Sequence, residues 1–198
     1  MVTLTVLDKG YVELVKYMTN EEDLVEILAI CHGKKFKPED TDRLIDYIMR
    51  HDHSSVLEHI VFRFKIKCPI FVARQWMRHR IGSYTEASLR GKRSELEFYI
   101  PNFDDPIAKQ VYESSIQVAY QAYEQLLQAG VKAEQARCVL PLCTYTEFYW
   151  TVNMRSLLNF LKLRLDASAQ WEIRQYAQAI LKIVYPLFRR ILKTYADN

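Results

Sequence analysis

Residues 60–68 show the clearest alternation of hydrophobic and polar positions in the chain. Successive side chains of a β-strand point to opposite faces, so alternation indicates a strand with one buried face. One parity is apolar and the other is basic: the apolar positions are Phe62, Phe64, Ile66 and Cys68, and the basic positions are Arg63, Lys65 and Lys67. The pattern therefore predicts a half-buried strand.

Apolar residues recur at helical spacing through most of the remaining sequence. Asn20 is predicted to cap a helix that ends near Gly33, and Pro38 begins a second helix. Further helices are expected near Ser54, from Pro69 to about Arg80, from Asp105 to Gly130, over a short segment ending near Pro141, and over 155–164 and 168–195, with a kink at Pro186. Residues 144–152 are rich in β-formers and fit either a strand or a helix.

These elements predict an α/β (α+β) fold, a helix-rich single domain over residues 1–198 with a small central sheet. The long helix carries Tyr112, Tyr120 and Tyr123, which fit either the core or an interface, and the core is the prediction we adopt. No Gly-x-Gly-x-x-Gly or Walker sequence is present, so the pattern argues against a Rossmann or P-loop protein.

The composition is typical of a globular protein, with 49% hydrophobic and 26% charged residues. Charged residues interrupt the apolar runs and no leader pattern opens the chain, so we expect a cytoplasmic protein without a membrane partner.

The cysteines form no Cys-x-x-Cys pair and are predicted to be reduced and mostly buried: Cys31, Cys68, Cys138 and Cys143.

The stretch from Arg78 to Arg90 combines three arginines, one histidine, one glutamate and two serines. Just before it, Arg74 lies four positions from Arg78 on one helical face, where two cations repel unless an anion lies between them. The planar arginine fork suits phosphate. The stretch therefore favours a nucleotide or flavin site, and a solvated basic face is the plain alternative.

Two other ligand classes fit less well. A nucleic-acid surface would use Arg74, Arg78, Arg80, Arg90 and Arg93, but the net charge of +3 is small and no nucleic-acid partner is predicted. The spacing of His51, His53 and His59 resembles a zinc site only weakly, and no cysteine pair supports it, so no metal is predicted. His53 fits a stacking or hydrogen-bonding role beside a cofactor, or a structural role.

The arginine-rich stretch also carries a family resemblance. The flavin-dependent thymidylate synthases share the signature Arg-His-Arg-x-x-Ser-x-Asn-Glu-x-Ser-x-Arg-Tyr, which is matched in register by Arg78, His79, Arg80, Ser83, Glu86, Ser88 and Arg90. Residues 53–59 resemble the family's His-x-Ser/Thr-x-x-Glu-His segment. Similar segments follow at 98–101, 136–141, 150–157, 160–164 and 169–172, so the resemblance runs through most of the chain.

This resemblance implies a methyltransferase that converts dUMP to dTMP. Methylenetetrahydrofolate would supply the carbon, and FAD reduced by NADPH would supply the hydride, while the protein supplies binding and orientation. The resemblance also implies a homotetramer whose active sites are built from several subunits. The expected partners are therefore dUMP, folate and further copies of the chain.

The resemblance assigns roles residue by residue. Arg164 and Ser88 are the expected catalytic residues, with Arg164 stabilising negative charge on the pyrimidine and Ser88 polarising it. The positions that match dUMP-binding residues are Gln75, Arg78, Glu86, Ser88, Leu89, Arg90, Arg137 and Arg164, of which Arg90 and Arg137 would hold the phosphate. The positions that match FAD-binding residues are His53, Ser55, Glu58, Arg78, His79, Arg80, Ile81, Asn153, Arg155 and Asn159. His53 also falls where the family's folate approaches the flavin.

The chain departs from the signature at two positions. Thr85 stands where the family has Asn, and Gly91, followed by Lys92 and Arg93, stands where it has Tyr. Relative to the family's Asn, Thr85 lacks the side-chain amide. Relative to the family's Tyr, Gly91 lacks the aromatic ring and loosens the loop. The alternative to an active enzyme is therefore a homologue that binds FAD and dUMP but turns over weakly.

Overall fold

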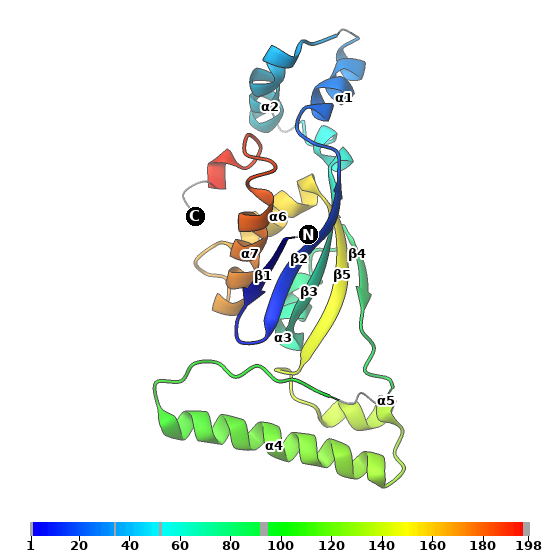
Figure 1. Ribbon diagram of the computed structural model, residues 1–198, viewed down its shortest axis with the longest axis vertical. Helices are drawn as coiled ribbons and strands as arrows, with labels where there is room; N and C mark the ends of the chain where they lie inside the picture. Colours follow the sequence, from blue (N-terminus) through cyan, green and yellow to red (C-terminus); the bar gives the residue numbers. More distant parts are fainter. Residues whose placement is uncertain (1, 34, 52, 92–94, 196–198) are drawn as a thin grey trace.

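The computed structural model describes residues 2–33, 35–51, 53–91 and 95–195, and Figure 1 shows how their elements are arranged. Within these residues five strands form one antiparallel sheet in the order β1-β2-β3-β5-β4. The strands are β1 (Val2–Val6), β2 (Gly10–Met18), β3 (Val61–Pro69), β4 (Ser83–Glu86) and β5 (Tyr145–Asn153). The predicted half-buried strand is therefore β3, at the centre of the sheet.

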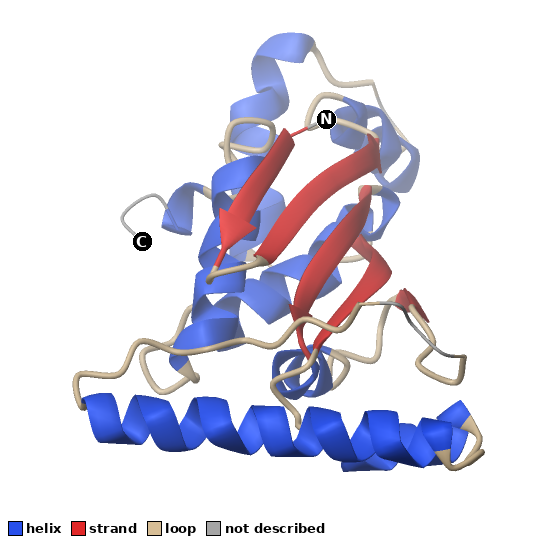
Figure 2. Cartoon of the chain, turned by 60° about the horizontal axis from the view of Figure 1, so that its bottom comes forward, coloured by secondary structure: helices blue, strands red, loops and turns tan. Residues whose placement is uncertain are grey.

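Helices cover one face of the sheet and one of its ends. They are α1 (Asp23–His32), α2 (Thr41–Arg50), α3 (Ile70–Trp76), α4 (Pro106–Gln128), α5 (Ala133–Ala136), α6 (Met154–Arg164) and α7 (Trp171–Val184), with 3₁₀ turns at Pro38–Asp40, Val56–His59, Arg137–Val139 and Lys193–Tyr195. The main core joins α3, α6 and α7 to the sheet face that carries Phe62, Phe64 and Trp150. α4 lies across one end of the sheet with α5 beside it (Figures 1 and 2).

The strands confirm one prediction and settle another. All four apolar positions of the alternating stretch are fully buried, at 0% exposure: Phe62, Phe64, Ile66 and Cys68. Residues 144–152 form a strand rather than a helix, because β5 pairs with β3 from Val61 opposite Asn153 to Pro69 opposite Tyr145. Its buried positions alternate in the same way, so tertiary pairing resolved what local propensity left open.

Two stretches of sheet are absent from the sequence prediction. β1 and β2 form a hairpin whose turn contains Leu7 at a φ of 59°. The hairpin packs closely on α7, since a Cβ added at Gly10 would lie 2.0 Å from the Tyr176 hydroxyl. The arginine-rich stretch, expected as a loop, contains β4, which pairs with β5 at the edge of the sheet.

Several helix ends also need correction. α1 begins at Asp23 rather than directly after Asn20, although the Asn20 Oδ1 accepts the Asp23 N–H at 2.9 Å. α3 ends at Trp76, where the His79 N–H donates to the Trp76 carbonyl at 3.0 Å and the chain turns. α7 ends at Val184, because Pro186 lacks the N–H that a continuing helix needs, so it stops the helix instead of kinking it. Residues near Ser54 form a 3₁₀ turn.

The prediction that the tyrosines of the long helix belong to the core is correct for one of the three. Along α4, all of which is described, Tyr123 is the one residue that is fully buried, and Tyr112 and Tyr120 are partly exposed. Val111 and Val118 are exposed by 60% and 66%. α4 therefore lies outside the main core and presents apolar side chains on its surface.

The helices and the cysteines also bear on the expectations from the sequence. None of its helices in the described ranges is long and apolar enough to cross a membrane. Cys68 and Cys143 are free and buried as predicted, whereas Cys138 is free and exposed. The side chain of Cys31 lies outside the described part of the molecule.

Candidate functional site

Arg164 is fixed by hydrogen bonds to the segment that follows α3. Its Nε donates to His79 Nε2 at 3.0 Å, and its Nη2 donates to the Gln75 backbone carbonyl at 2.9 Å. Arg164 is the last residue of α6, and Gln75 lies in the last turn of α3. The structure thus brings together residues that the resemblance assigned to the pyrimidine and to the flavin.

His79 must be neutral to accept this hydrogen bond. Burial and the neighbouring Arg164 charge lower the pKa of His79 to about 4. The Nε2 atom accepts from Arg164, so the ring proton lies on Nδ1 in this arrangement. The His79–Arg164 pair is therefore stable across the pH range in which most enzymes work.

Arg164 and Arg78 together create a positive site. Burial and the proximity of Arg78 both lower the pKa of Arg164. Among the described residues no carboxylate lies within ion-pair distance of either guanidinium. Two adjacent cations without an acidic partner favour an anionic or electron-rich ligand between them.

The Gln75 side chain has a defined partner as well. Its Nε2 donates to the Gln170 Oε1 at 2.6 Å, just before α7 begins. This contact leaves the side-chain carbonyl oxygen of Gln75 as an acceptor for a ligand N–H. Gln170 falls in the segment 169–172 that resembles the family, but the resemblance assigns it no role.

The residues assigned to the phosphate meet at a different place, around Glu134. The Arg90 Nη2 lies 3.1 Å from Glu134 Oε2, and the Arg137 Nε donates to the Glu134 carbonyl at 3.2 Å. Glu134 belongs to α5, directly before the turn that carries Arg137. The Arg90 side chain is 71% exposed, so this arginine pair is open to a ligand.

The loop that leads to Arg90 is held by neighbouring groups. Glu86 Oε1 accepts the Thr146 hydroxyl at 2.7 Å, and Ser88 Oγ accepts the Arg90 N–H at 3.1 Å. Leu89 lies between Ser88 and Arg90 and is partly exposed.

The positions assigned to FAD gather where β5 passes into α6. Asn153 caps α6 by accepting the Ser156 N–H at 2.9 Å, and Arg155 lies 2.7 Å from Glu58. The backbone bond from Met154 to Ile60 draws the Glu58 segment to the same point. Asn159 follows Arg155 by one turn on the exposed side of α6.

Among the remaining FAD positions, Ile81 lies near this point. Gly82 packs so closely that an added Cβ would lie 3.0 Å from the Thr151 carbonyl, which sets the preceding Ile81, exposed by 71%, beside this end of β5. Arg80 and Ser55 are at least partly exposed. The His53 Nε2 lies 3.3 Å from the Tyr47 hydroxyl.

A single chain does not join these groups into one site. Ala87 bonds to Glu147, whereas Asn153 ends the same strand, and six residues of strand span about 20 Å. Across the described residues, no hydrogen bond or ion pair links Arg90 or Arg137 to Arg164. The phosphate arginines and the flavin positions therefore lie at opposite ends of β5.

The two departures from the signature fall outside these contacts. Thr85 is opposite Tyr149 and so faces the open side of the sheet, whereas Glu86 is opposite the buried Phe148. A Cβ added at Gly91 would meet no atom within 4 Å. Lys92 and Arg93, the latter part of the nucleic-acid alternative, lie outside the described residues.

Two of the three histidines considered for a metal pack against an aromatic ring. The His51 and His53 rings lie 4.5 and 5.2 Å from the Tyr47 ring, measured between centroids. In the described ranges no group of three His, Cys, Asp or Glu side chains is arranged to hold a metal ion.

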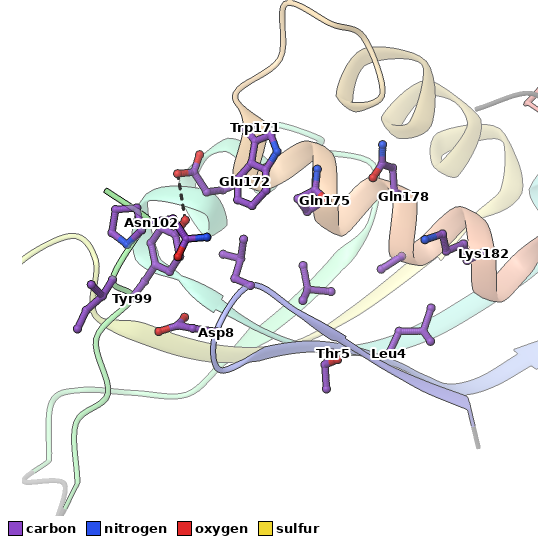
Figure 3. Close-up of a pocket in the computed structure, with 15 residues that line it drawn as sticks. Leu4, Thr5, Asp8, Tyr99, Asn102, Trp171, Glu172, Gln175, Gln178 and Lys182 are labelled. Carbon is purple, nitrogen blue, oxygen red and sulfur yellow. Dashed lines mark hydrogen bonds between the residues drawn. The ribbon is translucent and has the colours of Figure 1, made fainter. Parts of the chain in front are cut away.

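A cavity of about 790 Å³ lies between β1, the segment from Tyr99 to Asn102, and α7 (Figure 3). The Tyr99 hydroxyl donates to Glu172 at 3.4 Å at one end of it. None of the residues assigned to dUMP or FAD lines this cavity. Its volume therefore gives no support to the assigned roles, which rest on the contacts around Arg164 and Glu134.

The chain is similar in sequence to proteins of a known family. Residues 13–188 match the family described as thymidylate synthase complementing protein. The chain belongs to this family. The flavin-dependent thymidylate synthase of Thermotoga neapolitana is 53% identical over 189 residues, which cover 91% of this chain and 88% of that protein. The enzyme of the same name from Thermus thermophilus is 47% identical over 199 residues, which cover 92% of this chain and 74% of that protein.

Solved structures show the same fold. The UMP/dUMP methylase PolB from Streptomyces cacaoi, bound with 5-Br dUMP, superposes with a TM-score of 0.84 at 28% identity and covers 97% of each chain. The same methylase bound with 5-Br UMP gives a TM-score of 0.82 at 29% identity, covering 96% of this chain and 95% of the methylase. The family resemblance drawn from the sequence is therefore confirmed.

Proposed function

We propose that this protein is a flavin-dependent thymidylate synthase that methylates dUMP to dTMP. The observation that carries the proposal is Arg164, which His79 and the Gln75 backbone carbonyl hold beside Arg78 with no acidic partner among the described residues. Such a guanidinium can stabilise the negative charge that develops on the pyrimidine as it is activated. The identity of 53% with a thymidylate synthase supports the same reaction.

The nucleotide is held from two sides in this proposal. Arg90 and Arg137 bind the phosphate, which displaces Glu134 from Arg90. Gln75 accepts from the pyrimidine, and Arg78 and Arg164 lie against it. The loop positions Glu86, Ser88 and Leu89 orient the ring between these groups.

The residues at the end of β5 fit a flavin. Arg155 supplies a cation for a diphosphate, and the exposed Ile81 supplies an apolar surface for a flat ring. The group bound there would supply the hydride, with methylenetetrahydrofolate as the carbon source and NADPH as the reductant. The protein's part is to orient the pyrimidine and stabilise its charge.

We further propose that the site is completed by other copies of the chain, in a homotetramer. The phosphate arginines would hold dUMP and the positions at the far end of β5 would hold FAD, so a second copy of the chain is needed to bring the two ligands together. α4 offers a surface for assembly, with Ile107, Val111 and Val118 exposed by 70%, 60% and 66%. Its neighbouring Ser114, Ala119 and Ala122 are small enough for a second helix to approach closely.

The reaction is tested by incubating the protein with FAD, NADPH, methylenetetrahydrofolate and dUMP under low oxygen, with detection of dTMP by mass spectrometry. Product that disappears when FAD is omitted supports the proposal. A parallel reaction with UMP shows whether the site discriminates between nucleotides with and without a 2′-hydroxyl. This test is needed because PolB, which has the same fold, is described as a UMP/dUMP methylase. A flavin-bound protein that forms no dTMP contradicts the proposal and favours the weakened homologue.

The assembly is tested by native mass spectrometry of Val118→Glu, with Gln117→Glu as the matched control. A charge at Val118 enters the proposed interface and should give smaller species that bind less FAD. The control adds the same charge elsewhere on the helix and should remain a tetramer. Tetramers of the Val118 variant would show that α4 is not the interface.

A further inference from the structure

Tyr84 lies in β4 between the two arginine groups, and its side chain turns toward the covered face of the sheet. Its ring stacks on Trp150, with centroids 6.3 Å apart and planes at 20°, and lies 6.1 Å from the Phe148 ring. Trp150 and Phe148 belong to the core and are almost completely buried. The Tyr84 ring is therefore held by the rigid part of the molecule.

The hydroxyl of this ring holds the backbone that carries the flavin positions. It donates to the His79 carbonyl at 2.8 Å and lies 3.3 Å from the Trp76 carbonyl. Burial raises the pKa of Tyr84 to about 12, so the hydroxyl remains a donor at working pH. The residues between these two carbonyl groups include Arg78, and Arg80 follows directly.

The same contact reaches the pyrimidine residue through His79. The His79 carbonyl is bound by Tyr84, and its ring accepts from Arg164. The next residues along the chain are fixed by Gly82, where an added Cβ would lie 2.9 Å from Trp150 Nε1. The segment from His79 to Gly82 is thus held near Trp150 at both ends, at His79 through the hydrogen bond to Tyr84 and at Gly82 by close packing.

We propose that Tyr84 is a positioning residue for the methylation reaction, because its hydroxyl sets the segment Arg78–Arg80 against the sheet and, through His79, aims Arg164. The inference rests on the proposed function. Tyr84 occupies an unspecified position of the family signature, yet its hydroxyl binds His79, the residue that links the flavin positions to Arg164. Tyr84 itself touches neither ligand in this scheme.

The experiment compares Tyr84→Phe with Tyr176→Phe. Both changes remove one hydroxyl that donates to a backbone carbonyl at 2.8 Å, but the partner of Tyr176 is Lys67, which has no assigned role. FAD affinity is measured by flavin fluorescence, and kcat and the KM for dUMP are measured at saturating FAD. We expect Tyr84→Phe to weaken FAD binding about tenfold and to lower kcat about tenfold, with a change in KM below about threefold. Tyr176→Phe should keep FAD affinity and kcat.

FAD affinity and kcat within about twofold of the Tyr176→Phe values would overturn the proposal. The FAD measurement decides this even if the wild-type protein forms no dTMP, a result that would contradict the proposed function alone. If Tyr84→Phe does not fold, a trifluorotyrosine at position 84 replaces it. This phenol ionises far more readily than tyrosine and then cannot donate, so FAD affinity should fall as pH rises, whereas that of the wild type should not. A profile parallel to the wild type would also overturn the proposal.

Discussion

The two arginine groups of the proposed site are built in different ways. Arg164 is partly buried, and a neutral histidine and a backbone carbonyl fix its guanidinium. Arg90 is exposed by 71%, and its partner is an acidic side chain that a phosphate would have to displace. The first group is set in its working position by the fold, whereas the second is left open.

This difference corresponds to the tasks that we propose for the two groups. A group that stabilises charge during a reaction is most effective when it needs no reorganisation as the charge develops. A group that captures a phosphate from solution must be accessible, and its own ion pair with Glu134 is exposed and therefore weak. Substitutions in the two groups should consequently affect different kinetic constants.

The largest expected effect is that of Arg164→Ala. Loss of one preorganised donor should lower kcat for dTMP formation about 10³-fold. FAD should remain bound, because the positions at the end of β5 keep their contacts. Turnover is measured together with the flavin absorbance of the purified protein. An equal loss of flavin would move Arg164 from the pyrimidine to the flavin site and would remove the distinction between the groups.

Arg90→Ala should act on binding rather than on turnover. One charge-assisted contact to phosphate contributes about 3 kcal/mol at most, so the KM for dUMP should rise about 100-fold with little change in kcat. Deoxyuridine, which lacks the phosphate, provides the control and should bind both proteins equally. A fall in kcat without a change in KM would contradict the assignment to the phosphate.

The free energy of unfolding should depend on pH through His79, the histidine that accepts a hydrogen bond from Arg164. Its pKa is about 4 in the folded protein, below the unfolded value of 6.5, so the unfolded chain takes up a proton first as the pH falls. The free energy of unfolding should therefore decrease between about pH 6.5 and 4, by at most ~1.4 kcal/mol per pH unit. Denaturation of the flavin-free protein is compared with that of His79→Gln, which cannot titrate. Parallel profiles would show that His79 is not held neutral.

The smallest effect is expected from Glu134→Gln, which removes the ion pair that competes with phosphate. An exposed pair contributes about 1 kcal/mol or less, so the KM for dUMP should fall about threefold. Glu39→Gln, at an exposed pair with Lys37, changes the net charge equally and should leave KM unchanged. A higher KM in the Glu134 variant would mean that Glu134 holds the arginines in place for the phosphate.

Prediction from the sequence succeeded where one local rule decides the structure. Alternation fixed the position of β3, and the Asp105-Pro106 pair marked the start of α4, where the Asp105 side chain caps the Ile107 N–H at 2.9 Å. It failed at β1, β2 and β4, because an edge strand or hairpin depends on a partner elsewhere in the chain. Pro186 was expected to kink the last helix, whereas α7 ends before it at Val184.

The site shows the same division. Matching motifs were enough to recognise the family, because a motif depends on residue identity and order along the chain. The roles that the resemblance assigns to the arginines stay predictions. Tyr84 and Glu134 gave no signal in the sequence, and Gln170 gave none beyond its place in a family segment, since the contacts of each form only on folding.

The sequence by itself determined the central strand, the long helix, the family and the set of charged residues, all of which follow from periodicity and from identity in register. The tertiary structure decided the surroundings of those charges: the neutral His79 that accepts a hydrogen bond from Arg164, the separation of the two arginine groups along β5, and the exposed face of α4. The physical reason is that a pKa, a hydrogen bond and an exposed surface depend on the distance to groups that only folding brings together.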